Sequence, residues 1–191
     1  MPTQETQAGV LDIAANRGAC KFSRSELAGR VLWGIAWPLF RLTPRPFFWP
    51  WRVFLLRMFG AKIGRKVRIN PSARVFLPWN LTIGDYATIG SGANLYSVGP
   101  IRIGARATVS QYTHICAGGH DPSSTTLELT RPPISIGEDA WVAADAFVGP
   151  GVTIGRGAIV SARAAVFANV DDMVIVSGNP ARPQGFRDIQ N

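Results

Sequence analysis

The sequence has few of the residues that build metal sites and disulfide frameworks. It contains two cysteines, Cys20 and Cys116, and two histidines, His114 and His120, in 191 residues. The cysteines lie far apart, without a spacing typical of a disulfide framework or a metal site, which favours a reducing compartment. Two histidines are too few for a three-histidine zinc site unless another ligand substitutes, so we expect no metal.

Long apolar runs are also missing. The longest strongly apolar stretch, residues 31–40, lies between Arg30 and Arg41 and is interrupted by Pro38. A membrane-spanning helix needs ~20 apolar residues, so we expect none. The first 20 residues lack a basic start followed by an apolar core, which argues against a secretory signal. Together with the cysteine usage, this predicts a cytoplasmic protein.

Acidic residues are scarce, with 12 Asp and Glu against 20 Lys and Arg, for a net charge of +8. This excess of positive charge indicates an anionic partner: nucleic acid, a phospholipid surface or a phosphate-bearing ligand. Charge alone does not choose among them. No recognised nucleic-acid-binding motif accompanies the charge, so we expect no nucleic acid partner.

A six-residue rhythm runs through the C-terminal two thirds of the chain. One position of each hexad is aliphatic, and the residue four further on is usually small. The aliphatic positions are Ile63, Ile69, Val75, Ile83, Ile89, Leu95, Ile103, Val109, Ile115, Ile136, Val142, Val148, Ile154, Val160 and Val166. Neither an amphipathic helix nor a sandwich strand has a period of six.

Three hexads close one triangular coil of 18 residues. Residues 63–80, 83–100, 103–120 and 136–171 therefore make about five coils, and two-residue insertions at Leu81-Thr82 and Ile101-Arg102 reset the register. Each side is a short strand with its aliphatic residue inside a narrow prism, and coils stack ~4.8 Å apart through backbone hydrogen bonds. The sequence predicts an all-β fold, a parallel β-helix.

The other segments follow from this repeat. We expect a flexible, dispensable arm over residues 1–24, a helical region over 25–62, the β-helix over 63–176 with an extruded loop at 121–135, and a tail over 177–191. The region 25–62 interleaves tryptophan with arginine, and Pro44, Pro46 and Pro50 divide it into short helices. Such a region either caps the β-helix or contacts a membrane surface, and both interpretations stay open.

Polar residues beside the loop are the candidate catalytic residues. His120 ends its coil immediately before the extruded loop, and loops on rigid scaffolds commonly carry sites. Asn94 lies one coil before His114 in the same column, on another corner from His120. In a threefold assembly different corners of neighbouring subunits face one another, so Asn94 of one subunit could meet His120 of the next.

Several segments resemble the hexapeptide-repeat acyltransferases, which wind as left-handed β-helices. The closest likeness is to the colanic acid biosynthesis acetyltransferase group, related to galactoside and maltose acetyltransferases. It covers residues 33–184 through PFFWPWRVFLLRMFGAKIG, PSARVFLPWNLTIGDYATIG, NLYSVGPIRIG, GGHDPSS, AWVAADAFVGPGVTIG and SGNPAR. The resemblance implies a homotrimer that transfers an acetyl group from acetyl-CoA to a hydroxyl group of a saccharide.

The resemblance also implies roles for particular residues. GGHD is similar to the family's catalytic histidine motif, which makes His120 the general base and Asn94 an acceptor-site residue of the catalytic centre. Asp121, His114 and Tyr96 would line the substrate, with His114 the less suited of the two histidines to be the base. The positions that match the family's coenzyme A contacts are Trp141, Ala144, Ala162 and Arg182.

The chain departs from the family at Phe167-Ala168-Asn169, where relatives often carry Thr-Lys-Asp. This departure removes a lysine that the family commonly places near the cofactor.

Two alternative functions share the fold: a non-catalytic β-helix scaffold, and a metal enzyme of the γ-carbonic anhydrase type. The retention of His120, Asp121 and Asn94 beside the loop weighs against the scaffold. Localisation is expected in the cytoplasm, including the inner face of the membrane.

Overall fold

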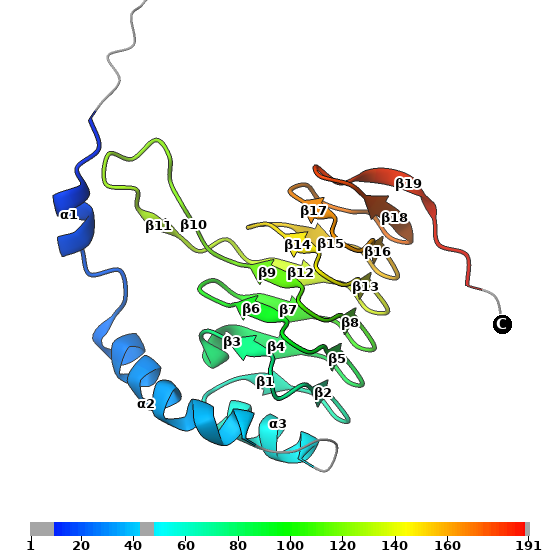
Figure 1. Ribbon diagram of the computed structural model, residues 1–191, viewed down its shortest axis with the longest axis horizontal. Coiled ribbons are helices and arrows are strands. Elements are labelled where there is room, and N and C mark those ends of the chain that lie inside the picture. Colours follow the sequence, from blue (N-terminus) through cyan, green and yellow to red (C-terminus); the bar gives the residue numbers. More distant parts are fainter. Residues whose placement is uncertain (1–9, 43–47, 190–191) are drawn as a thin grey trace, which may run out of the picture.

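The computed structural model describes residues 10–42 and 48–189 and contains a parallel β-helix flanked by helices (Figure 1). The three sides of its triangular coils form three parallel sheets. The first sheet contains β1 (Lys62–Ile63), β4 (Leu81–Ile83), β7 (Ile101–Ile103), β12 (Ile134–Ile136) and β15 (Thr153–Ile154). The second contains β2 (Arg68–Ile69), β5 (Thr88–Ile89), β8 (Thr108–Val109), β13 (Trp141–Val142), β16 (Ile159–Val160) and β18 (Val174–Ser177). The third contains β3 (Arg74–Val75), β6 (Asn94–Tyr96), β9 (His114–Cys116), β14 (Phe147–Val148) and β17 (Ala165–Val166).

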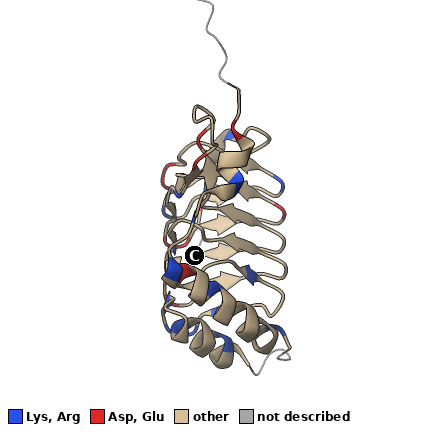
Figure 2. Ribbon diagram, turned by 90° about the vertical axis from the view of Figure 1, so that its left-hand side faces the viewer, with Lys and Arg blue, Asp and Glu red and all other residues tan. Residues whose placement is uncertain are grey.

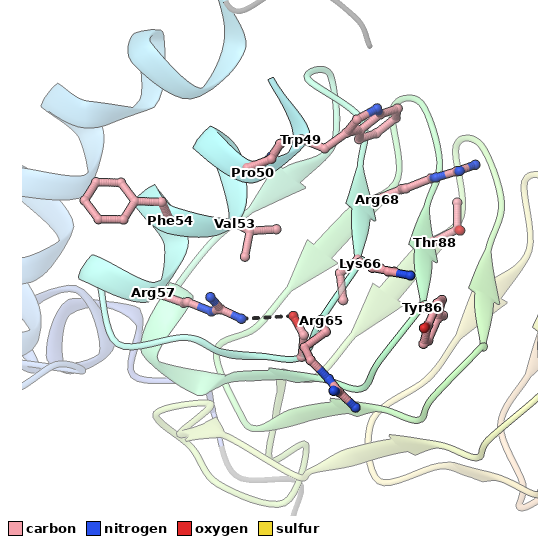
Figure 3. A pocket seen from close by; sticks show the side chains of 12 residues that line it. Trp49, Pro50, Val53, Phe54, Arg57, Arg65, Lys66, Arg68, Tyr86 and Thr88 are labelled. Carbon is pink, nitrogen blue, oxygen red and sulfur yellow. Dashed lines mark hydrogen bonds between the residues drawn. The ribbon is translucent and has the colours of Figure 1, made fainter. Parts of the chain in front are cut away.

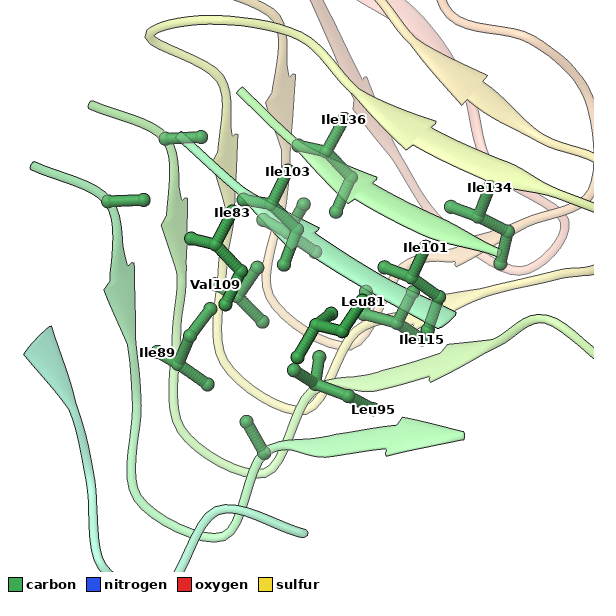
Figure 4. Packing of buried hydrophobic residues seen from close by; sticks show 14 of the residues in the cluster. Leu81, Ile83, Ile89, Leu95, Ile101, Ile103, Val109, Ile115, Ile134 and Ile136 are labelled. Carbon is green, nitrogen blue, oxygen red and sulfur yellow. The ribbon is translucent and has the colours of Figure 1, made fainter. Parts of the chain in front are cut away.

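The core is the column of aliphatic side chains inside the prism (Figure 4). All fifteen aliphatic positions read from the six-residue rhythm are buried. The fold prediction is confirmed, with five complete coils and part of a sixth, which consists of a bridge from Val170 to Ile154 and strand β18. Each two-residue insertion adds one residue to the start of a strand, Leu81 in β4 and Ile101 in β7. These two residues are buried and pair with each other in register, so the insertions extend the core.

Close stacking of the coils depends on glycine at one corner. A Cβ on Gly104 would lie 2.5 Å from the backbone nitrogen of Glu138, and one on Gly84 would lie 2.5 Å from that of Ala105. Real Cβ atoms do not approach backbone so closely, and backbone in the next coil cannot yield without breaking its ladder. Glycine is therefore required at this corner.

Three helices precede the β-helix: α1 (Ile13–Gly18), α2 (Arg24–Arg41) and α3 (Trp49–Met58). Ser23 and Glu26 form a capping box that starts α2. Unlike the short pieces expected, α2 has 18 residues and continues through Pro38, because this proline lies in the last turn. Pro44 and Pro46 lie outside the described residues. None of the helices in the described part of the chain has the length and apolar character needed to cross a bilayer.

Helix α3 covers the first coil. Its Val53, Leu55 and Leu56 are buried, and the buried Arg52 donates a 2.7 Å hydrogen bond from Nε to the carbonyl oxygen of Ile69 in β2. Helix α2 packs Trp33, Ala36 and Phe40 into the same core cluster. The described parts of region 25–62 therefore cap the open end of the β-helix.

Residues 10–24 of the expected flexible arm and the described residues of the expected tail both contact the rest of the protein. In the expected arm, α1 contacts the extruded loop, since the Asp12 N–H donates to the Thr125 carbonyl oxygen at 2.9 Å. In the expected tail, β19 (Arg182–Phe186) pairs antiparallel with β18 and extends the second sheet. The six-residue rhythm could not reveal either contact, because neither segment follows it.

Candidate functional site

His120 lies on a hairpin that leaves the β-helix after the third coil. The hairpin pairs β10 (Gly119–His120) with β11 (Leu129–Thr130). The chain returns to the first sheet at Ile134, just before the end of the loop expected at 121–135. The Nδ1 atom of the exposed His120 ring lies 2.7 Å from the carbonyl oxygen of Leu127. A carbonyl oxygen can only accept a hydrogen bond, so Nδ1 carries the proton in the neutral ring. The Nε2 atom is then the unprotonated one, as a general base requires.

Helices α1 and α2 hold this hairpin at its tip and at its base (Figure 1). Asn16 of α1 donates through Nδ2 to the carbonyl oxygens of Thr126 and Leu127, the second at 3.3 Å. At the base, Arg131 forms a 2.6 Å ion pair with Glu26 and donates to the Lys21 carbonyl oxygen at 2.7 Å. The same Leu127 carbonyl oxygen therefore faces both Asn16 and His120.

Asp121 stabilises the turn that follows His120. Its Oδ1 accepts from the backbone N–H of Ser123 at 2.9 Å and from the Ser123 hydroxyl at 2.6 Å. These hydrogen bonds hold the pKa of the Asp121 carboxyl below its ordinary value. The contacts shape the loop, and the substrate contact expected for Asp121 stays a prediction.

The other expected substrate residues share the outer face of the third sheet. Asn94 pairs in register with Arg74 on one side and with His114 on the other. Tyr96 lies two residues after Asn94 on the same face, and its ring centroid is 6.3 Å from that of His114. The structure thus brings Asn94, Tyr96 and His114 together on adjacent coils.

His114 is enclosed by aromatic rings. The Phe147 ring meets it edge-on, with centroids 5.4 Å apart, opposite Tyr96. Burial lowers the pKa of His114 and so favours the neutral form of the ring. Its Nε2 is buried with no hydrogen-bond partner among residues 10–42 and 48–189. His114 therefore has an apolar setting, unlike the exposed and hydrogen-bonded His120.

The expected coenzyme A positions fall at the C-terminal half of the β-helix. Trp141 is 45% exposed, and its indole N–H donates to the Ser110 hydroxyl at 2.9 Å. Ala144 and Ala162 occupy equivalent corners of successive coils, where the N–H of Arg163 donates to the Ala144 carbonyl oxygen at 2.9 Å. These residues follow one edge of the prism.

Arg182 lies apart from these residues, in a cavity of about 710 Å³ between the β18–β19 hairpin and the last coil. Phe167, Ala168 and Asn169 line the same cavity, so the departure from the family's Thr-Lys-Asp pattern faces Arg182. Arg182 is exposed, and its guanidinium donates to the Ala181 carbonyl oxygen at 3.0 Å. A cation beside an apolar wall suits a phosphate-bearing ligand with an apolar arm, which is the chemistry of coenzyme A.

Sequence reasoning missed the partners of the hairpin. Asn16 and Thr126 are 110 positions apart, and nothing in their local sequence links them. It also missed that Arg30, Arg41 and Arg74 gather beside Asn94. Within the described ranges no three His, Cys, Asp or Glu side chains lie close enough to hold a metal ion.

Comparisons with known proteins agree with this fold. Residues 133–168 match the family described as "Bacterial transferase hexapeptide (six repeats)". The protein named "Putative colanic acid biosynthesis acetyltransferase WcaF" in Escherichia coli strain K12 is 47% identical over 152 residues, which cover 80% of this chain and 83% of the relative. The chain belongs to the hexapeptide-repeat acetyltransferases.

Solved structures of other hexapeptide-repeat acetyltransferases have the same fold. One from Vibrio cholerae O1 biovar eltor, complexed with acetyl coenzyme A, superposes with a TM-score of 0.78 at 24% identity, covering 88% of this chain and 93% of that one. A galactoside acetyltransferase in complex with coenzyme A gives a TM-score of 0.73 at 19% identity, covering 87% and 84%. At these identities the likeness concerns the fold.

Proposed function

We propose that this hexapeptide-repeat acetyltransferase moves an acetyl group from acetyl-CoA to a hydroxyl group of a saccharide, with His120 as the general base. The observation that carries the proposal is the hydrogen bond from Nδ1 of His120 to the Leu127 carbonyl oxygen. In the neutral ring this bond places the proton on Nδ1, leaves Nε2 free to accept a proton and orients the ring, as the base of a hydroxyl group needs. Acetyl-CoA, when bound, supplies the acetyl group activated as a thioester.

Different residues of the chain act on the acceptor saccharide and bind the acetyl donor. The free Nε2 of His120 takes the proton of the hydroxyl group as its oxygen bonds to the acetyl carbon and the carbon–sulfur bond to coenzyme A breaks. The protonated His120 can then return that proton to the departing thiolate, while Asn94 and Tyr96 hold the saccharide. Arg182 would bind a phosphate of the donor, and Trp141 would provide a flat apolar wall. Ala144 and Ala162 leave backbone groups accessible beside it, since neither has a side chain beyond Cβ.

An acceptor screen tests the proposal directly. Purified protein with acetyl-CoA should release coenzyme A when a hydroxyl-bearing saccharide is present, and the acetyl ester should be found on that saccharide by mass spectrometry. If no saccharide in a broad panel causes release of coenzyme A, the non-catalytic scaffold is favoured instead.

We predict a homotrimer with sites between subunits. Exposed aromatic side chains lie along the prism, with Tyr112 64%, Phe167 62% and Trp141 45% exposed, and a neighbouring subunit would cover them. A threefold assembly closes such faces into a water-excluding cleft and can give the buried Nε2 of His114 a partner. Light scattering should give about three chain masses. A stable monomer with full activity would contradict both the trimer and a site shared with Asn94 of another subunit.

We also propose that the protein works in the cytoplasm at the inner face of a membrane. The outward side of α2 and α3 is apolar, with Ile35 70%, Leu42 81% and Met58 67% exposed. Next to it, Arg57, Lys66 and Arg68 surround a groove of about 800 Å³ whose apolar wall includes Trp49 and Phe54 (Figure 3). Figure 2 shows the Lys and Arg positions on the helices that face the viewer. Apolar side chains rimmed by cations suit an anionic bilayer.

The prediction is that the protein cosediments with vesicles of phosphatidylglycerol and less with vesicles of phosphatidylcholine. Replacing both Ile35 and Leu39 with Asp should reduce binding to phosphatidylglycerol by at least ~10-fold, since the burial of each apolar side chain contributes ~1.5–3 kcal/mol. Phe186→Asp is the control, because Phe186 is exposed on β19, away from these helices. Equal loss in the control, or a changed oligomeric state in the double variant, would contradict the membrane contact.

A further inference from the structure

A cavity of about 550 Å³ lies between α2 and the edge of the third sheet, beside Asn94. Its polar lining comes from Arg30 and Arg41 of α2, Arg74 of β3 and Asn94 of β6. Trp37 and Phe76 provide aromatic walls. The cavity therefore combines guanidinium groups from a helix and a strand that are distant in sequence.

Fixed contacts build this cavity. The Trp33 indole N–H donates to the Val75 carbonyl oxygen at 2.8 Å and ties α2 to β3. The Trp37 ring stacks on Phe40 with centroids 5.1 Å apart. The guanidinium carbon of Arg30 lies 5.1 Å from the Phe76 ring centroid and 4.4 Å from that of Phe22. Cation–π contacts on two rings hold Arg30 in place without neutralising its charge.

No Asp or Glu is among the described residues that line the cavity. Glu26 is the one acidic residue in the sequence of α2, and it pairs with Arg131 at the base of the hairpin. Arg41 and Arg74 are exposed and make no ion pair with any residue of the described ranges. Three like charges around one cavity repel each other, and an anion between them relieves that repulsion.

The ligand chemistry follows from the side chains. Guanidinium groups present two parallel N–H donors that match the oxygens of a phosphate, and they remain charged at all physiological pH values. Aromatic faces beside them suit the apolar face of a sugar ring. Since Arg74 and Asn94 are register partners on adjacent strands, ~4.8 Å apart, one ligand can contact both.

We propose that this cavity binds a phosphate or pyrophosphate group attached to the acceptor saccharide. The proposal rests on the proposed transfer to a saccharide and narrows its substrate class to phosphorylated saccharides. The phosphate sits among Arg30, Arg41 and Arg74, and the sugar lies over Trp37 towards Asn94. A neutral saccharide leaves the three guanidinium groups without a counter-charge and binds more weakly.

The first test measures binding of inorganic pyrophosphate to the whole protein by calorimetry. The variant R41Q/R74Q should bind it at least ~10-fold more weakly, because two charge-assisted contacts are lost. Arg102→Gln is the matched control, since Arg102 is exposed on β7 in the first sheet and outside the cavity. Unchanged binding in the double variant, or equal loss in the control, would overturn the proposal.

The second test compares acceptors and separates this proposal from the proposed function. The KM should be ~10-fold lower for a phosphorylated saccharide than for its neutral parent, and R41Q/R74Q should remove the difference. A sugar 1-phosphate and a polyprenyl-pyrophosphate-linked saccharide distinguish a soluble source from a lipid-linked one. Equal KM values for neutral and phosphorylated acceptors overturn the proposal. If no saccharide is acetylated but R41Q/R74Q still abolishes pyrophosphate binding, the proposed function fails and the anion site stands.

Discussion

Replacing His120 with alanine should lower kcat by ~10² to 10⁴-fold, the range expected for loss of a general base. The Kd for acetyl-CoA should change little, since the residues proposed to hold the donor lie elsewhere on the prism. Steady-state kinetics of the release of coenzyme A, with binding measured separately, checks both. His120→Asn should be equally impaired, because its amide has no basic nitrogen.

The control for this prediction is His114→Ala in the same assay. The His114 ring lies nearly perpendicular to the rings of Tyr96 and Phe147, and burial favours its neutral form. We expect less than a ~10-fold loss in kcat for a residue that lines the site without taking a proton. Both variants should be compared in the oligomeric state of the unchanged protein. An inactive His114 variant beside an active His120 variant would reverse the assignment of the base.

Gly104→Ala should destabilise the fold by about 3 kcal/mol, because the new Cβ would lie 2.5 Å from the backbone nitrogen of Glu138. The clash is with backbone that belongs to the next coil, so relief requires the coils to separate. Thermal unfolding followed by circular dichroism should show a Tm lower by about 10 °C.

Gly34→Ala is the control, because it makes the same substitution at a position where an added Cβ meets no neighbouring atom. No atom lies within 4 Å of a Cβ added to Gly34 in the interior of α2. Alanine there should stabilise the helix by ~0.5–1 kcal/mol, so the sign of the effect is opposite. A Tm for Gly104→Ala equal to that of the unchanged protein would mean that adjacent coils are less tightly stacked than the structure indicates.

The six-residue rhythm of the sequence was sufficient to predict the β-helix, because each coil contacts only its neighbours and local spacing determines the whole prism. Ile89 and Val142 could be placed in the core by counting alone. The break in the rhythm after His120 located the hairpin, and GGHD pointed to the histidine on it. The arm and the tail were predicted less well, since α1 and β19 are ordered by contacts and not by a repeat.

The sequence by itself determined the coil repeat, the interior aliphatic column and the histidine beside the loop. The tertiary structure decided which tautomer His120 adopts, through Leu127, and which helix supports that loop, through Asn16. It also decided that Arg30 and Arg74 line one cavity. The physical reason is that these contacts depend on how the hairpin folds back on itself and on the path of the N-terminal helices along the β-helix, and a local pattern of residues carries no information about either.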